Sequence, residues 1–328
     1  YVAMNGDGEP AQGTVVLDGQ PGEAFERVSA LTFSPDSNHF AYIAARAGKE
    51  RVVLDGKPGT EYDSVDPYFL RFTPSGSLGY RAGSGGKMVV VLDGKVVAES
   101  EGILDWSAAV QGPGSAVITR SGSTWSVVFN GAKGADFDSI SAPAALSPDG
   151  AHVVYAARKG QQEFIVKDGA PGAAWDFIAQ IPRFSADGSH WGYVAERGGK
   201  WFVVVDGHEN GPYDWFAWGG VRFSPDGKRY AYLVQRGPKW LVIVDGKSVV
   251  ESDGVATTPL RWSADGQHFA CMIQQGTKWG VIVDGEPGPL FDRLFDSVPE
   301  FSPDGSLNYP AVRENTLYRV THVPAEVR

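Results

Sequence analysis

Aromatic and acidic residues that no repeating pattern explains stand at a few points of the 328-residue chain. Large aromatic side chains exposed on a loop are typical of binding surfaces, because they offer much apolar area for a partner to cover. Carboxylates among them can accept hydrogen bonds or hold a cation. The candidate binding residues chosen on this ground are Asp66, Tyr68, Phe69, Asp105, Trp106, Gln180, Trp215, Trp218, Thr257, Phe295 and Asp296.

Sequence signatures of the common enzyme chemistries are missing. The chain has no Gly-x-Ser-x-Gly elbow, no phosphate-binding Gly-rich loop and no dinucleotide fingerprint. Its single cysteine, Cys271, excludes an intrachain disulfide and a cysteine metal cluster, and no two histidines have zincin spacing. We therefore expect no cofactor. Calcium stays open as an alternative, provided that Asp66, Asp105 and Asp296 converge.

The net charge and the hydropathy of the chain argue against two classes of binding partner, nucleic acids and membranes. A net charge of −10 argues against a nucleic-acid ligand, because phosphate binding needs a basic face. No apolar run approaches the ~20 residues that cross a bilayer, so we expect no membrane insertion. An acidic binding surface would favour basic or neutral partners: a protein, a peptide or a glycan. We expect a monomer.

Two short sequence words alternate along the chain, and the step from the Asp or Asn of one copy of the first word to that of the next is 37 to 39 residues. The first is an apolar run ending in Asp-Gly, and it occupies 15–19, 52–56, 90–94, 127–131 (with Asn130), 165–169, 203–207, 242–246 and 281–285. The second is Phe-Ser-Pro-Asp-Gly or a close variant, and it occupies 33–37, 72–76, 146–150, 184–188, 223–227, 262–266 and 301–305, with a degraded copy at 110–114. Such internal repetition indicates an array of identical supersecondary units.

Each repeat has room for four short strands joined by turns, and Asp-Gly is favourable for tight hairpins. A single sheet of this size cannot bury its apolar faces, but copies packed radially in a ring can. The sequence therefore predicts an all-β fold, a closed β-propeller of eight four-stranded blades forming one domain over residues 1–328. The N-terminal strands are expected to complete the last blade. Seven blades with an irregular closure is the alternative.

Repetition also separates structural residues from candidate functional ones. Trp125, Trp201, Trp240 and Trp279 share one register, which predicts a place in the core between blades. Arginines that precede the inner-strand aromatic are expected to pair with the aspartates of the repeated aromatic-Asp pair. The arginines are Arg71, Arg183, Arg222 and Arg261, and the aspartates are Asp63, Asp176, Asp214 and Asp253. The candidate binding residues lie in the segments that link one blade to the next, where loops on a rigid scaffold carry function.

The repeat resembles the TolB-type β-propeller repeat, a relative of the WD repeat. The resemblance rests on Phe223–Gly227 with Ala231-Tyr232 and on Phe33–Asp36 with Ala41-Tyr42, and it covers nearly the whole chain. It implies a bacterial envelope assembly or a larger multidomain protein as context. A periplasmic or exported location is favoured over a cytoplasmic one. Because the chain begins with Tyr1 in mid-pattern, we expect that a leader or upstream segment has been removed.

Three hypotheses for function follow. The first is a non-catalytic binding scaffold that recognises a protein, peptide or glycan through the aromatic candidates. The second is a propeller hydrolase of the lactone, ester or phosphotriester type, with its site at the mouth of the central channel of the propeller. Such an enzyme could depend on calcium. The third is a domain of a larger protein, such as the gating propeller of a serine peptidase.

Overall fold

The structure is a computed structural model and describes residues 2–5, 12–141, 143–295 and 299–323. These residues form antiparallel β-sheets, and no helix occurs among them, which confirms the all-β prediction. The chain divides into two compact units, residues 1–159 with 166–170 and residues 160–165 with 171–328. They are referred to as unit 1 and unit 2.

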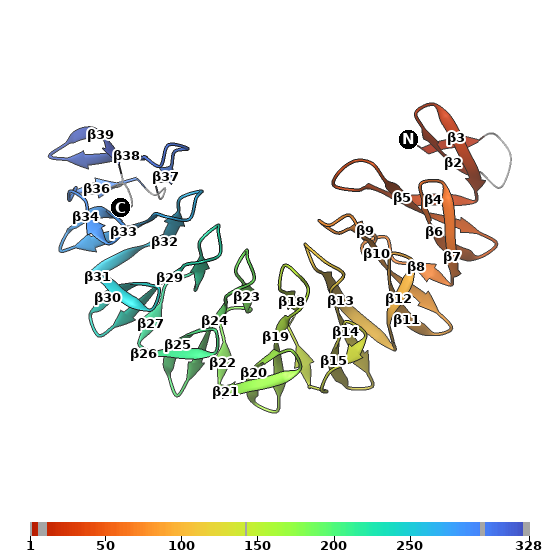
Figure 1. Cartoon of the computed structure of the whole chain (residues 1–328), viewed down its shortest axis with the longest axis horizontal. Helices are drawn as coiled ribbons and strands as arrows, with labels where there is room; N and C mark the ends of the chain where they lie inside the picture. Colours follow the sequence, from red (N-terminus) through yellow and green to blue (C-terminus); the bar gives the residue numbers. More distant parts are fainter. Residues whose placement is uncertain (1, 6–11, 142, 296–298, 324–328) are drawn as a thin grey trace. The chain divides into compact units, whose positions relative to one another are not determined.

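Unit 1 holds consecutive antiparallel sheets, each built from strands that are near one another in the sequence (Figure 1). The first two contain β1 (Val2–Asn5), β2 (Gln12–Leu17) and β3 (Gln20–Phe25), then β4 (Arg27–Phe33), β5 (Phe40–Arg46), β6 (Lys49–Leu54) and β7 (Lys57–Tyr62). The next contains β8 (Ser64–Val65), β9 (Arg71–Phe72), β10 (Leu78–Ser84), β11 (Lys87–Leu92) and β12 (Lys95–Ser100). The remaining strands are β13 (Gly102–Ala108), β14 (Ser115–Ser121), β15 (Thr124–Phe129) and β16 (Ala132–Lys133), followed by β17 (Ser139–Ile140), β18 (Ala145–Leu146) and β19 (Val153–Lys159).

Unit 2 repeats the same plan. The chain passes from one unit to the other within β20 (Gln162–Lys167) and β21 (Ala170–Trp175). Two sheets follow: β22 (Phe177–Ile178), β23 (Arg183–Phe184), β24 (Trp191–Arg197), β25 (Lys200–Val205) and β26 (His208–Tyr213), then β27 (Trp215–Phe216), β28 (Arg222–Phe223), β29 (Tyr230–Arg236), β30 (Lys239–Val244) and β31 (Lys247–Ser252). The last two are β32 (Gly254–Trp262), β33 (Phe269–Gln275), β34 (Lys278–Val283) and β35 (Glu286–Pro287), then β36 (Arg293–Leu294), β37 (Glu300–Phe301), β38 (Leu307–Arg313) and β39 (Thr316–His322).

In most of the sheets, the Asp-Gly word closes the hairpin between the last two long strands. At Asp55-Gly56 both residues have positive φ, 50° and 75°, which is the backbone of a two-residue turn that suits twisted strands. The Asp55 carboxylate also accepts a hydrogen bond from the Phe40 N–H at 3.0 Å and contacts the His39 ring nitrogen at 2.7 Å. One aspartate therefore shapes its turn and fixes the start of the second strand.

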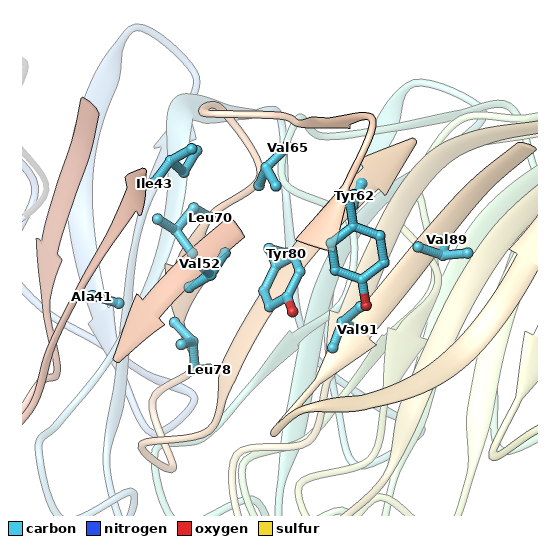
Figure 2. Close-up of a cluster of buried hydrophobic side chains, with 11 residues drawn as sticks. Ala41, Ile43, Val52, Tyr62, Val65, Leu70, Leu78, Tyr80, Val89 and Val91 are labelled. Carbon is cyan, nitrogen blue, oxygen red and sulfur yellow. The ribbon is translucent and has the colours of Figure 1, made fainter. Parts of the chain in front are cut away.

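Alternate residues of a strand serve the two faces of its sheet, so that a sheet within a unit can pack against the sheet before it and the sheet after it. In β5, Ala41 and Ile43 join a core with Tyr80 and Val91 of the following sheet, whereas Tyr42 packs with Phe25 of the preceding one. Figure 2 shows the first of these cores, with the rings of Tyr62 and Tyr80 next to each other. The apolar faces are buried between sheets, as the repeat predicts.

In several sheets, the first strand in chain order is divided into two short strands. β8 and β9 both pair with β10, and β27 and β28 both pair with β29. The residues between the two halves form the irregular loop of each sheet. Tyr68, Gln180 and Trp218 therefore lie within an interrupted first strand rather than in a linker outside the sheet.

Ring closure, the count of eight blades and the sharing of the last blade concern how the two units sit together, and they stay predictions. Within the residues that the structure describes, the chain forms no helix with the length and apolar character that a membrane crossing needs.

Candidate functional site

Five aromatic side chains of unit 2 form a continuous cluster that reaches the protein surface. Phe177 meets Trp201 edge to face, with ring centroids 6.4 Å apart, and Trp201 meets Trp215 in the same way at 5.5 Å. Phe216 packs on Trp201 at 4.7 Å and on Trp218 at 6.3 Å. We call these five residues the aromatic surface.

Three members of the aromatic surface are largely exposed. Trp218 is 73% exposed, Phe177 48% and Trp215 45%, whereas Phe216 is buried beneath them. Exposed indole and phenyl rings next to each other offer an apolar patch that a partner can cover. The buried member supports the exposed ones from below.

The loop that carries Trp218 is held by the neighbouring sheet. The side-chain amide of Gln180 donates a hydrogen bond to the Gly219 carbonyl at 3.2 Å and accepts one from the Val221 N–H at 3.2 Å. Gly220 has a φ of 56°, and a Cβ atom there would lie 1.9 Å from Gln180 Oε1. A glycine at position 220 therefore leaves room for the Gln180 amide to approach the backbone. The loop is held in place in the unbound protein, which reduces the cost of ordering it on binding. Gln180 is a positioning residue and not a free binding group.

An ion pair fixes the start of β27, the strand of Trp215. Asp214 accepts hydrogen bonds from Lys200 Nζ at 2.6 Å and from the Gly237 N–H at 2.6 Å. The Lys200 ammonium and the Gly237 amide lower the pKa of Asp214, which stays ionised at neutral pH. Lys200 begins β25 and Gly237 follows β29, so Asp214 ties two sheets together directly beside Trp215.

The arrangement differs from the expected pairing of repeated arginines and aspartates. Asp63, Asp214 and Asp253 each bind a lysine, Lys49, Lys200 and Lys239, at 2.5 to 2.6 Å. The prediction that the arginines serve as their partners is wrong for these three. The lysine opens the third strand of the preceding sheet and reaches the aspartate directly.

Phe177 is a surface residue that sequence reasoning missed. It directly follows Asp176, at the register where the other repeats place Arg27, Ser64, Gly102, Ser139, Gly254 and Arg293. Only here and at Trp215 does an aromatic residue occupy that register, and these two repeats are adjacent. Comparing the repeats at this position would have found it.

Asp66, Tyr68 and Phe69 lie together in the irregular loop between β8 and β9. Arg81 donates a hydrogen bond to the Asp66 carboxylate, and its guanidinium lies 3.7 Å from the centre of the Phe69 ring. Asp66 Oδ1 also accepts the Tyr68 N–H at 3.0 Å. Tyr68 is 89% exposed, whereas Asp66 and Phe69 shape the loop.

Trp106 lies in the core and not at the surface. Its side chain is 2% exposed and packs across the sheets against Gly79, where a Cβ atom would lie 2.2 Å from the indole. The Arg71 guanidinium lies 4.2 Å from the centre of the ring and donates to the Trp106 carbonyl at 2.6 Å. Asp105 faces the same arginine at 3.6 Å. Both candidates therefore serve packing between sheets.

The remaining candidates add little to a site. Phe295 is 37% exposed and is stacked by Arg293, whose guanidinium lies 4.9 Å from the ring centre. Thr257 lies in β32, and its side chain is outside the described part of the structure, as is Asp296 altogether. Among the described residues, no group of three or more acidic, histidine or cysteine side chains could hold a metal ion. Asp66 and Asp105 each face an arginine instead of a shared cation position.

Comparisons with known proteins give a fold likeness only. No family model and no curated protein matches the chain. Among solved structures, the eukaryotic initiation factor is similar over 87% of this chain and 84% of its own, at 14% identity and a TM-score of 0.46. The β-propeller domain of the Trilobed protease from Pyrococcus furiosus covers 77% and 92%, at 13% identity and a TM-score of 0.31. TolB from Acinetobacter baumannii covers 79% and 79%, at 13% and 0.31.

Proposed function

We propose that this protein is a non-catalytic binding scaffold that holds a partner protein segment on its aromatic surface. The observation that carries the proposal is Trp218, which is 73% exposed on a loop that Gln180 holds in place. An indole exposed to water is unfavourable unless a partner covers it. A rigid support beneath the indole also reduces the conformational entropy that is lost when the partner binds.

The chemistry of the surroundings favours a peptide or protein segment with apolar and basic side chains. Tryptophan is enriched among the residues that dominate protein interfaces. Ile181, 37% exposed, extends the apolar area beside Gln180. The net charge of −10 favours approach of a basic partner, and the faces of Trp215 and Trp218 can receive its cations.

A selection experiment tests the proposal. A random peptide library is selected on the wild-type protein, and the affinities of the selected peptides are measured against Trp215→Ala and Trp218→Ala. Loss of a central interface tryptophan typically costs 2 kcal/mol or more, so we expect at least ~30-fold weaker binding. Phe33→Ala is the matched control, since Phe33 is an aromatic residue 58% exposed in unit 1.

The outcomes distinguish the alternatives. Peptides that bind wild type and both tryptophan variants equally contradict the proposal. A glycan array is probed with the same variants. A glycan that binds only the wild-type protein would show that the aromatic surface is a binding site, but for a carbohydrate instead of a peptide.

A further inference from the structure

Unit 1 contains a buried hydroxyl that no described group satisfies. Tyr155 lies on β19 and is 1% exposed, and among the described residues its hydroxyl oxygen has no hydrogen-bond partner. A buried polar group without a partner costs free energy and needs an explanation.

Comparison of the repeats explains why the hydroxyl is unpaired. Tyr80 and Tyr232 occupy the same register and hydrogen-bond to Tyr62 and Tyr213. Tyr155 instead faces Phe137, edge to face at 6.4 Å, in a geometry close to the 6.0 Å of the Tyr62–Tyr80 pair seen in Figure 2. The phenyl ring is in place, and only the partner hydroxyl is missing.

A pocket opens at this point. It has a volume of about 140 Å³, and its apolar wall includes Val127, Phe129 and Val153 together with Tyr155. Gly134 lines it as well, and a Cβ atom there would lie 3.4 Å from the Tyr155 hydroxyl, so the hydroxyl lies at this wall. A cavity of about 150 Å³ is large enough to hold benzene.

The charges at the pocket are already paired. Lys133 lies 2.8 Å from Asp136, and Asp168 lies 2.8 Å from the His152 ring nitrogen. Burial raises the pKa of Tyr155 to about 12, so its hydroxyl keeps its proton at neutral pH and can donate. The pocket thus presents apolar walls and one buried donor, with no unpaired charge on Lys133 or Asp168.

We propose that this pocket binds a small neutral molecule with an apolar body about the size of benzene and one hydrogen-bond acceptor, such as a ketone, which accepts from the Tyr155 hydroxyl. The inference is independent of the aromatic surface, which lies in unit 2.

The test compares two probes of similar shape, cyclohexanone and methylcyclohexane, by NMR titration of the wild-type protein. One hydrogen bond is worth roughly 1 kcal/mol, so cyclohexanone should bind about fivefold to tenfold more tightly. In Tyr155→Phe the two probes should bind equally. In Phe137→Tyr, which supplies an internal partner, the preference should also disappear, and this variant keeps the test valid if Tyr155→Phe does not fold.

Tyr309→Phe is the matched control. The Tyr309 hydroxyl is likewise buried and unpaired among the described residues. Tyr309 belongs to the same core cluster as Phe291, which occupies the register of Phe137 in unit 2. This variant should keep the cyclohexanone preference. The proposal is overturned if neither probe binds, or if the preference for cyclohexanone survives in Tyr155→Phe. Either result would indicate that no acceptor ligand binds the Tyr155 hydroxyl in this pocket.

Discussion

The side-chain amide of Gln180 accepts a hydrogen bond from the Val221 N–H at 3.2 Å, across the boundary between two sheets of unit 2. The same amide donates to the Gly219 carbonyl, so both ends of the Gly219–Val221 backbone are held by one side chain. Trp218 precedes this segment. Its exposed position is therefore a built feature of the fold.

The contact between Gln180 and Gly220 predicts how alanine behaves at the glycine. Gly220→Ala places a Cβ atom on Gln180 Oε1 and forces a left-handed residue, which should lower the free energy of unfolding by about 2 to 3 kcal/mol. Gly122→Ala is the control, because Gly122 has a similar φ of 58° with open space around it, and it should cost only about 1 kcal/mol. Urea unfolding measures both.

A double-mutant cycle separates the two costs of Gly220→Ala, which are the clash of its Cβ with Gln180 and the strain of a left-handed alanine. Gln180→Ala removes the colliding oxygen, so the cost of Gly220→Ala in that background should fall to the Gly122→Ala value. A cost that is the same in both backgrounds would show that Gln180 does not approach Gly220.

Trp106 and Trp218 should respond to truncation in opposite ways. Trp106→Ala leaves a cavity beside Gly79 and should lower the free energy of unfolding by about 3 to 5 kcal/mol. Trp218→Ala removes an exposed side chain and should change it by no more than about 0.5 kcal/mol. Chemical denaturation of both variants checks this, and a stable Trp106→Ala protein would contradict its burial.

Repetition within the sequence predicted the sheets better than it predicted the site. The Asp-Gly and Ser-Pro-Asp-Gly words specify turns through local backbone and side-chain geometry, which a sequence reveals directly. Trp106 was misplaced because its burial depends on Gly79, a residue of another sheet that leaves room for the indole. Gln180 was found as an irregular residue, but its role depends on a loop 39 residues away. Such pairings between sheets are not visible from the spacing of residues along the chain.

Replacing either of two buried phenylalanines by tyrosine should raise the stability of the protein. Phe137→Tyr and Phe291→Tyr each bring a phenol oxygen toward an unpaired buried hydroxyl, on Tyr155 and Tyr309 respectively. One new hydrogen bond should raise the free energy of unfolding by about 0.5 to 1.5 kcal/mol. Phe216→Tyr, at a buried ring between tryptophans, is the comparison and should not gain. Destabilisation by both substitutions would show that the hydroxyls cannot meet.

Stability should fall in acid through the repeated Ser-x-Asp turns. Hydrogen bonds from Ser34 and Asn38 lower the pKa of Asp36 from 3.8 to about 2. Because the folded-state pKa lies below the unfolded one, this contribution is present above about pH 4 and is lost as the pH falls toward 2. Hydrogen bonds from Ser147 and Ser224 likewise lower the pKa values of Asp149 and Asp226.

Urea unfolding between pH 2 and pH 7 measures this effect. Asp36→Asn should be less stable than wild type at neutral pH, and the difference should shrink as the pH falls through this window. A difference that stays constant down to pH 2 would contradict the assigned role of the Asp36 carboxylate.

In the proposed binding scaffold, a partner covers Trp215 and Trp218. Fluorine NMR of protein labelled with 5-fluorotryptophan tests it most directly, with each resonance assigned by a Trp→Phe variant and a peptide selected on the wild type as the titrant. We expect the Trp215 and Trp218 resonances to shift on binding while those of Trp240 and Trp279 stay in place. Shifts confined to Trp240, Trp279 or Trp125, with Trp215 and Trp218 unchanged, would contradict it.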